Sequence, residues 1–123
     1  MCLHTVLVVD DHAAVRRAVC ELFGNMPECV CDEAGNGKEA IEKARKTRPD
    51  VVILDFAMPE MNGMQAAQAL HEIIPGVPMY LLTVHGHKAM RVAASLSGIT
   101  SVFSKSEDLK GLVSEVCAVL RRR

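Results

Sequence analysis

Aromatic residues are scarce in this chain of 123 residues, which has no Trp, one Tyr and three Phe. Proteins that bind single-stranded nucleic acid stack its bases on aromatic side chains, so the composition argues against that role. The chain also lacks an excess of positive charge, because 14 Lys and Arg stand against 15 Asp and Glu for a formal net charge of −1. A near-neutral chain has no general attraction to the phosphate backbone. We therefore expect no direct binding of nucleic acid.

Long apolar runs are missing as well. A helix needs roughly 20 apolar residues to cross a bilayer, and no stretch of this sequence approaches that length. The segment Met1–His4 leads straight into a strand-like run without a charged leader. These features predict a cytoplasmic protein without a membrane partner.

A paired cysteine framework is the third absence. The five cysteines are odd in number and scattered over helix-like and strand-like segments: Cys2, Cys20, Cys29, Cys31 and Cys117. This pattern favours buried free thiols in a reducing compartment over disulfides. Cys29 and Cys31 are separated by one residue, whereas metal and redox motifs have two, so their spacing indicates one face of a strand.

The residues that are present have the composition of one globular domain. Half of them are apolar and about a quarter are charged, as is typical of globular proteins. A chain of 123 residues has the length of a single domain with one ordinary core. We therefore treat residues 1–123 as one domain.

Apolar strand-like runs alternate along the chain with segments of helical periodicity. The strand-like runs are Thr5–Val9, Cys29–Glu33, Val51–Leu54, Met79–Leu82 and Ser101–Ser104. The helical segments are His12–Phe23, Gly37–Lys46, Gly63–Ile73, Gly86–Leu96 and Ser106–Arg121. The alternation predicts an α/β fold with a five-stranded parallel sheet and five flanking helices. Right-handed crossovers favour two helices on one face and three on the other.

Polar side chains stand at the ends of four of these strands. Asp10 and Asp11 close the first apolar run, and Asp55 closes the third. Thr83 ends the fourth and Lys105 ends the fifth. The carboxyl ends of parallel strands meet at one edge of a sheet, where ligands bind in such folds. Three carboxylates there would repel one another, and a hard divalent cation with oxygen ligands relieves this. The pattern predicts a site for Mg²⁺, or Mn²⁺ in its place, beside a phosphoryl group.

The segment from Pro49 to Gly63 resembles the phosphoacceptor motif of the receiver domain of two-component response regulators. The resemblance extends over nearly the whole chain, from Thr5 to Leu120. It implies the flavodoxin-like, doubly wound fold with strand order 2-1-3-4-5. Periodicity alone indicates only a parallel α/β sheet.

The resemblance implies a role for each residue of the acidic edge. Asp55 would be the nucleophile that accepts a phosphoryl group from the phosphohistidine of a sensor histidine kinase or phosphotransfer protein. Asp11 would bind Mg²⁺ directly and Asp10 through metal-bound water. Asp55 and the backbone carbonyl of Ala57 would complete the metal ligands.

Two further residues would act on the phosphoryl group. Lys105 would supply a second positive charge, and Thr83 would hydrogen-bond a phosphoryl oxygen and bias the domain between two conformations. Such a protein catalyses only its own phosphorylation and dephosphorylation and is not an enzyme for an external substrate. Pro59 and Gly63 are expected to stiffen the loop after Asp55, with Gly63 permitting a tight turn.

The resemblance also implies partners. They are the kinase or phosphotransfer protein and a downstream output partner or fused output domain, which in related regulators is often DNA-binding. The fourth helix, fifth strand and fifth helix would form the output face and a homodimer contact. Because the sequence stops right after the fifth helix, the chain is either a complete single-domain regulator or a receiver cut from a longer protein with a C-terminal output domain.

Several positions depart from the family pattern. Val102 stands where many receivers have a switching aromatic residue, and Phe103 is expected on the opposite strand face, in the core. Val84 replaces a small residue and would narrow access to the site. His85 is expected to control the lifetime of the phosphoryl group, whereas the pair His85 and His87 lacks the companions of a transition-metal site. Ser106 replaces a proline, so we expect a trans peptide bond before it.

Three other functions compete with the signalling switch. A degenerate receiver would serve as a phosphorylation-independent docking module, which Val84 and Val102 favour slightly. An aspartate-nucleophile phosphatase would need a second Asp where this chain has Ala57. A flavodoxin would cradle phosphate after the first strand, where Asp10 and Asp11 would repel it without a metal.

Overall fold

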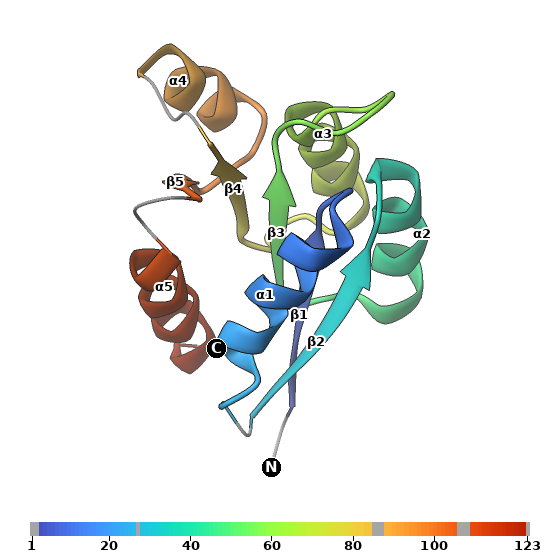
Figure 1. The fold of residues 1–123 in the computed structure, drawn as a ribbon. Coiled ribbons are helices and arrows are strands. Elements are labelled where there is room, and N and C mark those ends of the chain that lie inside the picture. The colour runs from blue at the N-terminus through green and yellow to red at the C-terminus, as the bar shows by residue number, and fades with distance from the viewer. Residues whose placement is uncertain (1–2, 27, 85–87, 106–108, 123) are drawn as a thin grey trace.

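Five strands and five helices alternate along the chain in the computed structural model, which describes residues 3–26, 28–84, 88–105 and 109–122 (Figure 1). The strands are β1 His4–Val9, β2 Cys29–Ala34, β3 Val51–Asp55, β4 Met79–Thr83 and β5 Ser101–Ser104. The helices are α1 Ala13–Phe23, α2 Gly37–Thr47, α3 Gly63–Ile73, α4 Lys88–Leu96 and α5 Leu109–Arg121. The strands form one parallel sheet in the order β2-β1-β3-β4-β5. The predicted fold class and strand order are confirmed.

The sheet lies between two layers of helices (Figure 1). One core cluster joins α1 and α5 to one face, through side chains such as Val6, Ile53 and Val116. The other joins α2, α3 and α4 to the opposite face, through side chains such as Leu54 and Leu70. The arrangement of two helices on one face and three on the other is therefore the predicted one. Every residue of β3 and β4 is buried, as expected for central strands covered on both faces.

The ends of the central strands differ from the predicted bounds in a way that matters for the site. The paired region of β3 extends to Asp55 and that of β4 to Thr83. Both polar residues are thus the last residues of their strands, held by the ladder itself. The predicted starts of the fourth and fifth helices, at Gly86 and Ser106, lie outside the described residues.

Helix α3 starts directly after the loop that follows Asp55, and its first turn is well capped. The Asn62 side chain accepts a hydrogen bond from the Gln65 backbone N–H, and the Gln65 side chain accepts one from the Asn62 N–H, both at 2.9 Å. This reciprocal capping box satisfies two helix-end donors. It fixes the far end of the loop that carries Ala57.

The cysteines correct one prediction. Cys20 of α1 and Cys31 of β2 form a disulfide, with their Cα atoms 5.8 Å apart, so the prediction of free thiols is wrong for this pair. Helix α1 packs on β2, which brings the two cysteines close enough to pair, and cysteine spacing alone does not reveal such pairing. Cys29 and Cys117 are half-buried free thiols, and Cys2 lies outside the described residues.

Among the described residues, no helix is long and apolar enough to cross a bilayer.

Candidate functional site

A cavity of 310 Å³ opens at the carboxyl edge of the sheet, where the predicted site residues meet. Its lining comes from the loop after β1, from the ends of β3, β4 and β5 with the residues that follow them, and from α4: His12, Asp55, Phe56, Ala57, Thr83, Val84, Met90 and Lys105. The structure thus brings Asp55, Ala57, Thr83 and Lys105 together from positions far apart in the sequence. Asp10 joins this group through a direct contact with Lys105.

The Lys105 ammonium bridges two buried carboxylates. Its Nζ lies 2.8 Å from Asp55 Oδ1 and donates a hydrogen bond to Asp10 Oδ2 at 3.0 Å. Asp10 is 2% exposed and Asp55 is 5% exposed. Because isolated buried carboxylates are costly, the ammonium between them stabilises the arrangement.

The backbone places Lys105 for this role. The Lys105 N–H donates a hydrogen bond to the Thr83 carbonyl at 2.8 Å, which continues the ladder of β4 and β5 by one step. The ammonium then reaches across the sheet edge to β3 and to the residue after β1. Sheet pairing and charge therefore act together to fix Lys105.

Asp10 is held from three directions. Its N–H donates to the Ala34 carbonyl at 3.1 Å, and its Oδ1 accepts a hydrogen bond from the His12 N–H at 2.9 Å. The Arg16 guanidinium donates through Nη1 to the Asp10 carbonyl at 2.7 Å. The carboxylate therefore has little freedom to turn away from Lys105.

Asp11 and His12 form a polar group with Asp10. His12 Nδ1 lies 3.1 Å from Asp11 Oδ1, and ligand atoms of the three side chains lie within 4.8 Å of one another. Carboxylate oxygens are the ligands that Mg²⁺ prefers, so the donor set around the acidic pair fits the predicted metal. Sequence reasoning gave His12 no part in the site, although its position next to two acids was a signal.

Burial sets the electrostatics of Asp55. It raises the pKa of the Asp55 carboxyl above its usual range, and the charges of Asp10 and Asp11 add to the rise, while the hydrogen bond and charge of Lys105 work against it. For Lys105, burial favours the neutral amine, but its hydrogen bonds to Asp55 and Asp10 outweigh this and raise its pKa. Lys105 therefore stays an ammonium ion at neutral pH.

The loop after Asp55 leaves no room for a side chain at Gly63. A Cβ on Gly63 would collide first with the Asp55 carbonyl oxygen, and it would come within 2.7 Å of Leu81 Cδ1 and 3.0 Å of Phe56 Cα. The Gly63 N–H also donates to the Phe56 carbonyl at 2.8 Å. Gly63 is thus required by close packing and not by a turn with positive φ, which this loop has at Glu60 (φ 68°). The loop is tight as predicted, but for a different reason.

Thr83 and Val84 occupy the rim of the cavity. Thr83 is buried at the end of β4, whereas Val84 is 59% exposed and also lines the cavity. A branched apolar side chain therefore stands at the entrance, as predicted. His85 and His87, and with them the predictions about phosphoryl lifetime and metal binding, lie outside the described residues, as does Ser106.

The fifth strand presents its residues as the alternation predicted. Val102 is buried in the core cluster shared by α2, α3 and α4. Phe103 faces the other side, where its ring lies 6.0 Å from that of Tyr80, centre to centre. Phe103 therefore does not take the place of the switching aromatic residue that Val102 replaces.

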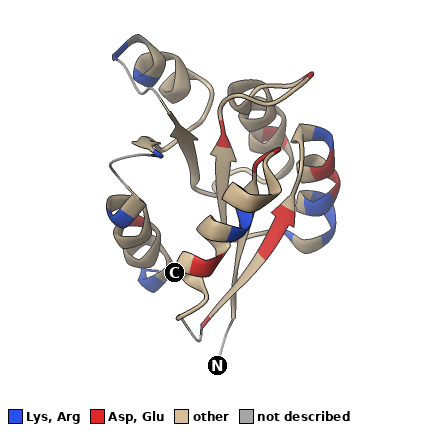
Figure 2. Ribbon diagram, viewed as in Figure 1, with Lys and Arg blue, Asp and Glu red and all other residues tan. Residues whose placement is uncertain are grey.

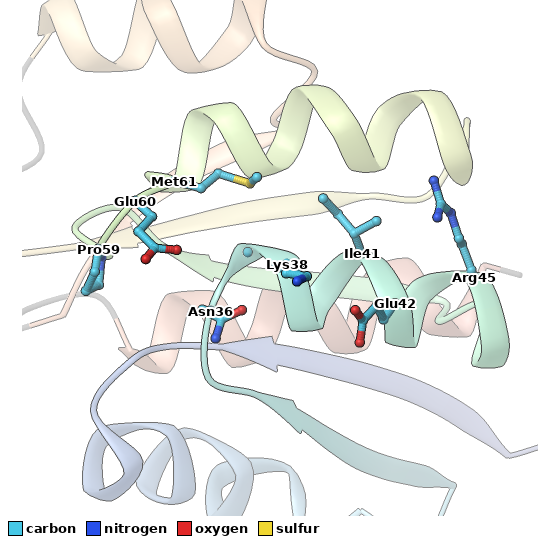
Figure 3. A pocket seen from close by; sticks show the side chains of 9 residues that line it. Asn36, Lys38, Ile41, Glu42, Arg45, Pro59, Glu60 and Met61 are labelled. Atoms are coloured by element: carbon cyan, nitrogen blue, oxygen red, sulfur yellow. The ribbon is translucent and has the colours of Figure 1, made fainter.

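A second cavity, of 370 Å³, lies between α2 and the loop from β3 to α3 (Figure 3). Lys38, Ile41, Glu42 and Arg45 extend from α2, and Pro59, Glu60 and Met61 come from the loop, with Asn36 and Gly37 completing the wall. Met61 lies so close to Gly37 that an added Cβ would meet its Sδ at 2.5 Å. None of the predicted site residues lines this cavity, so it is separate from the acidic site.

The fold and the acidic edge define a class: a doubly wound α/β protein whose site combines carboxylates, a hydroxyl and an ammonium. The sequence profile of the response regulator receiver domain matches residues 6–117. The chain belongs to this family. Receiver domains of two-component signalling generally bind Mg²⁺ at an acidic pocket, and the group of Asp10, Asp11 and His12 lies at the corresponding edge here.

Relatives of different lengths resemble the chain. It is 37% identical over 93 residues to the chemotaxis protein CheY of Thermotoga maritima, covering 76% of this chain and 78% of that protein. It is 36% identical over 121 residues to a protein-glutamate methylesterase/protein-glutamine glutaminase of Aliivibrio fischeri, covering 96% of this chain and 32% of the relative. The chain spans about a third of the length of the methylesterase relatives.

Solved structures give the same picture. A LuxR-family response regulator from Aurantimonas sp. SI85-9A1 superposes with a TM-score of 0.88 at 28% identity, covering 98% of this chain and 87% of the other. Vibrio cholerae CheY4 superposes with a TM-score of 0.88 at 27% identity, covering 96% and 99%.

Proposed function

We propose that this protein is a phosphorylation-controlled switch in which Asp55 accepts a phosphoryl group from the phosphohistidine of a sensor histidine kinase or phosphotransfer protein. The observation that carries the proposal is the position of Lys105, whose ammonium contacts Asp55 and Asp10 at the mouth of one cavity. A nucleophilic carboxylate beside a fixed positive charge is what phosphoryl transfer to an aspartate needs.

The transfer is a displacement at phosphorus. An Asp55 carboxylate oxygen forms the new bond to phosphorus while the bond from phosphorus to the donor imidazole nitrogen breaks. That nitrogen keeps the electron pair and takes up a proton from solvent. Lys105 stays beside the carboxylate and offsets the negative charge carried by the incoming phosphoryl oxygens.

The acidic pair serves a divalent cation. Asp11 and the Ala57 carbonyl would hold Mg²⁺, or Mn²⁺, together with Asp55, and Asp10 would act through metal-bound water. When bound, the cation offsets charge on the transferring oxygens. Asp10, held by three hydrogen bonds to its neighbours, keeps one wall of this pocket in place.

The phosphoryl group would act on the rest of the domain through Thr83. Its hydroxyl, at the end of β4, would hydrogen-bond a phosphoryl oxygen and draw the following segment inward. Because Val102 is buried and Phe103 packs on Tyr80, this change would pass to α4 without a swinging aromatic ring. The protein turns over no external substrate in this proposal.

The proposal places the domain, residues 1–123, in the cytoplasm with an output partner or a fused output domain. A LuxR-family response regulator and the longer methylesterase relatives illustrate two kinds of regulator with such a domain, and a DNA-binding output would make this protein a transcription regulator. The α4-β5-α5 face would form the output surface and a homodimer contact. Val92 and Leu96 of α4, exposed at 57% and 84%, support this surface.

Beryllofluoride, a phosphoryl mimic, provides the test. With Mg²⁺ present, we expect it to shift the amide NMR signals of Thr83 and Lys105 in the wild type and not in Asp55→Asn. Asp32→Asn is the matched control, because Asp32 lies on the edge strand β2 and pairs with Lys43 at 3.2 Å. Shifts in Asp55→Asn, or none in the wild type although Mg²⁺ binds, would favour the phosphorylation-independent docking module.

A further inference from the structure

Two side-chain contacts, one helical turn apart on α1, join this helix to β2: an ion pair and a disulfide. In the first, Arg16 Nε donates to Glu33 Oε1 at 2.8 Å. In the second, Cys20 is bonded to Cys31. Arg16 and Cys20 are four residues apart on one face of a helix, and Glu33 and Cys31 are two residues apart on one face of a strand. Figure 2 shows the basic band of α1 beside the acidic end of β2.

The ion pair between Arg16 and Glu33 is linked to Asp10 of the candidate metal site. The same guanidinium that binds Glu33 donates through Nη1 to the Asp10 carbonyl at 2.7 Å. Asp10 in turn accepts the hydrogen bond of Lys105. The place of α1 on β2 therefore sets where Arg16 can hold Asp10.

The disulfide between Cys20 and Cys31 can be formed by oxidation and broken by reduction. The Cα atoms of Cys20 and Cys31 are 5.8 Å apart, a separation that suits a disulfide without backbone movement. Both residues are half-buried at the edge of the core, so neither is sealed from solvent. In a reducing compartment such bonds are generally transient and redox-sensing.

We propose that Cys20 and Cys31 are a thiol–disulfide modification site that adjusts cation binding at the acidic pocket through Arg16. This inference rests on the proposed function for the identity of the cation. The disulfide fixes α1 on β2 and keeps Arg16 on both Glu33 and Asp10. After reduction, only the ion pair between Arg16 and Glu33 remains of these two contacts between α1 and β2. Arg16 then holds Asp10 less firmly, and Mg²⁺ binds more weakly.

The oxidant is a small disulfide such as oxidised glutathione. One protein thiolate attacks it and releases one glutathione thiol, which leaves a mixed disulfide. The second protein thiolate attacks that mixed disulfide and releases the other glutathione thiol. Two protein thiols are thus oxidised to one disulfide and one small disulfide is reduced to two thiols, which take up the two protons.

Cys29 provides a contrast within the same strand. It lies two residues before Cys31 on the same face, but burial raises the pKa of its thiol, and the charges of Glu28, Cys117 and Asp50 add to the rise. A thiol that stays protonated is a poor nucleophile. Cys29→Ser is therefore the matched control for a cysteine that takes no part.

Disulfide mapping tests the site. After incubation with oxidised glutathione, alkylation and peptide mass spectrometry, we expect a Cys20–Cys31 bond in the wild type and in Cys29→Ser. Dithiothreitol should free both thiols. A different pairing, or both thiols still open to alkylation, would overturn the site whatever happens at Asp55.

Mg²⁺ titration of the oxidised and reduced wild type, followed by amide NMR, tests the coupling without a mutation. We expect binding about fivefold tighter in the oxidised form, at the lower end of typical coupling between sites. Arg16→Gln should abolish the difference, whereas Arg17→Gln, an exposed neighbour on the same helix, should retain it. Equal affinities in the two wild-type forms, or a difference that survives in Arg16→Gln, would refute the coupling.

The two proposals fail in different ways. Absence of Mg²⁺ binding in both redox forms would remove the coupling together with the metal part of the proposed function. Normal Mg²⁺ binding and beryllofluoride shifts in both forms, with equal affinities, would leave the switch intact and remove only the redox coupling.

Discussion

Replacement of Lys105 by Met would leave two buried carboxylates without their shared ammonium. The wild-type Nζ lies 2.8 Å from Asp55 Oδ1 and 3.0 Å from Asp10 Oδ2. Met keeps most of the length of the stem and removes the charge, so packing changes little. The expected loss of stability therefore comes from electrostatics.

The magnitude follows from burial. Removal of one partner of a fully buried ion pair costs about 3–5 kcal/mol. The Lys105 side chain is 19% exposed and lines an open cavity, so water relieves part of this cost, and we expect a loss of about 2 kcal/mol without divalent cation. Saturating Mg²⁺ stabilises both proteins, but it should stabilise the variant more, because carboxylates that no longer share the Lys105 ammonium attract the cation more strongly. Binding about tenfold tighter in the variant recovers about 1.4 kcal/mol, so the loss should shrink to about 1 kcal/mol or less in saturating Mg²⁺.

Urea unfolding with EDTA and with saturating Mg²⁺ measures both values. Lys43→Met is the matched control, because Lys43 also pairs with carboxylates, at 3.2 Å from Asp32 and 3.7 Å from Glu39, and none of the three lines the cavity. Its loss should be the same in both solutions. A loss for Lys105→Met below about 0.5 kcal/mol in EDTA, or one that Mg²⁺ does not change, would refute the reasoning.

Three other substitutions probe the same region. Asp55→Asn should stabilise the protein at neutral pH, because burial raises the pKa of the Asp55 carboxyl and so makes its charged form costly in the folded state. Wild-type stability should fall as the pH rises from the carboxyl's usual pKa of 3.8 to its raised pKa in the folded protein. Urea unfolding across this pH range should show this fall in the wild type and not in Asp55→Asn. Gly63→Ala should cost about 1–3 kcal/mol by overpacking against the Asp55 carbonyl and Leu81. Gly111→Ala, whose Cβ would meet Phe103 at an ordinary 3.6 Å, should gain about 0.5–1 kcal/mol in the same measurement. The Tyr80 hydroxyl is buried and has no hydrogen-bond partner among the described residues, so Tyr80→Phe should leave the melting temperature unchanged or raised, and a clear drop would reveal a partner.

The fold could be predicted from the sequence because its signals are local. Apolar runs and helical periodicity alternate, and the parallel sheet follows from that alternation. Asp55 and Thr83 were recognisable because polar residues at the ends of apolar strands converge on one edge. The positions of Val102 and Phe103 followed from the alternation of side chains along a strand.

The contacts between distant segments could not be predicted in the same way. Lys105 and Asp10 are 95 residues apart in the chain, so the bridge between them depends on the full sheet. The disulfide between Cys20 and Cys31 depends on how α1 crosses β2, which cysteine spacing does not report. The steric demand on Gly63 comes from the Asp55 carbonyl, onto which the loop folds back, and from Leu81 on the neighbouring strand. The part of His12 in the acidic group comes from the turn after Asp10.

The central claim is that Asp55 accepts a phosphoryl group in a Mg²⁺-dependent reaction. Intact mass spectrometry after incubation with acetyl phosphate and Mg²⁺ tests it most directly, with EDTA and Asp55→Asn as controls. The account predicts one phosphoryl adduct in the wild type that is absent from both controls. An adduct that persists in Asp55→Asn, or no adduct on a protein shown to bind Mg²⁺, would contradict it.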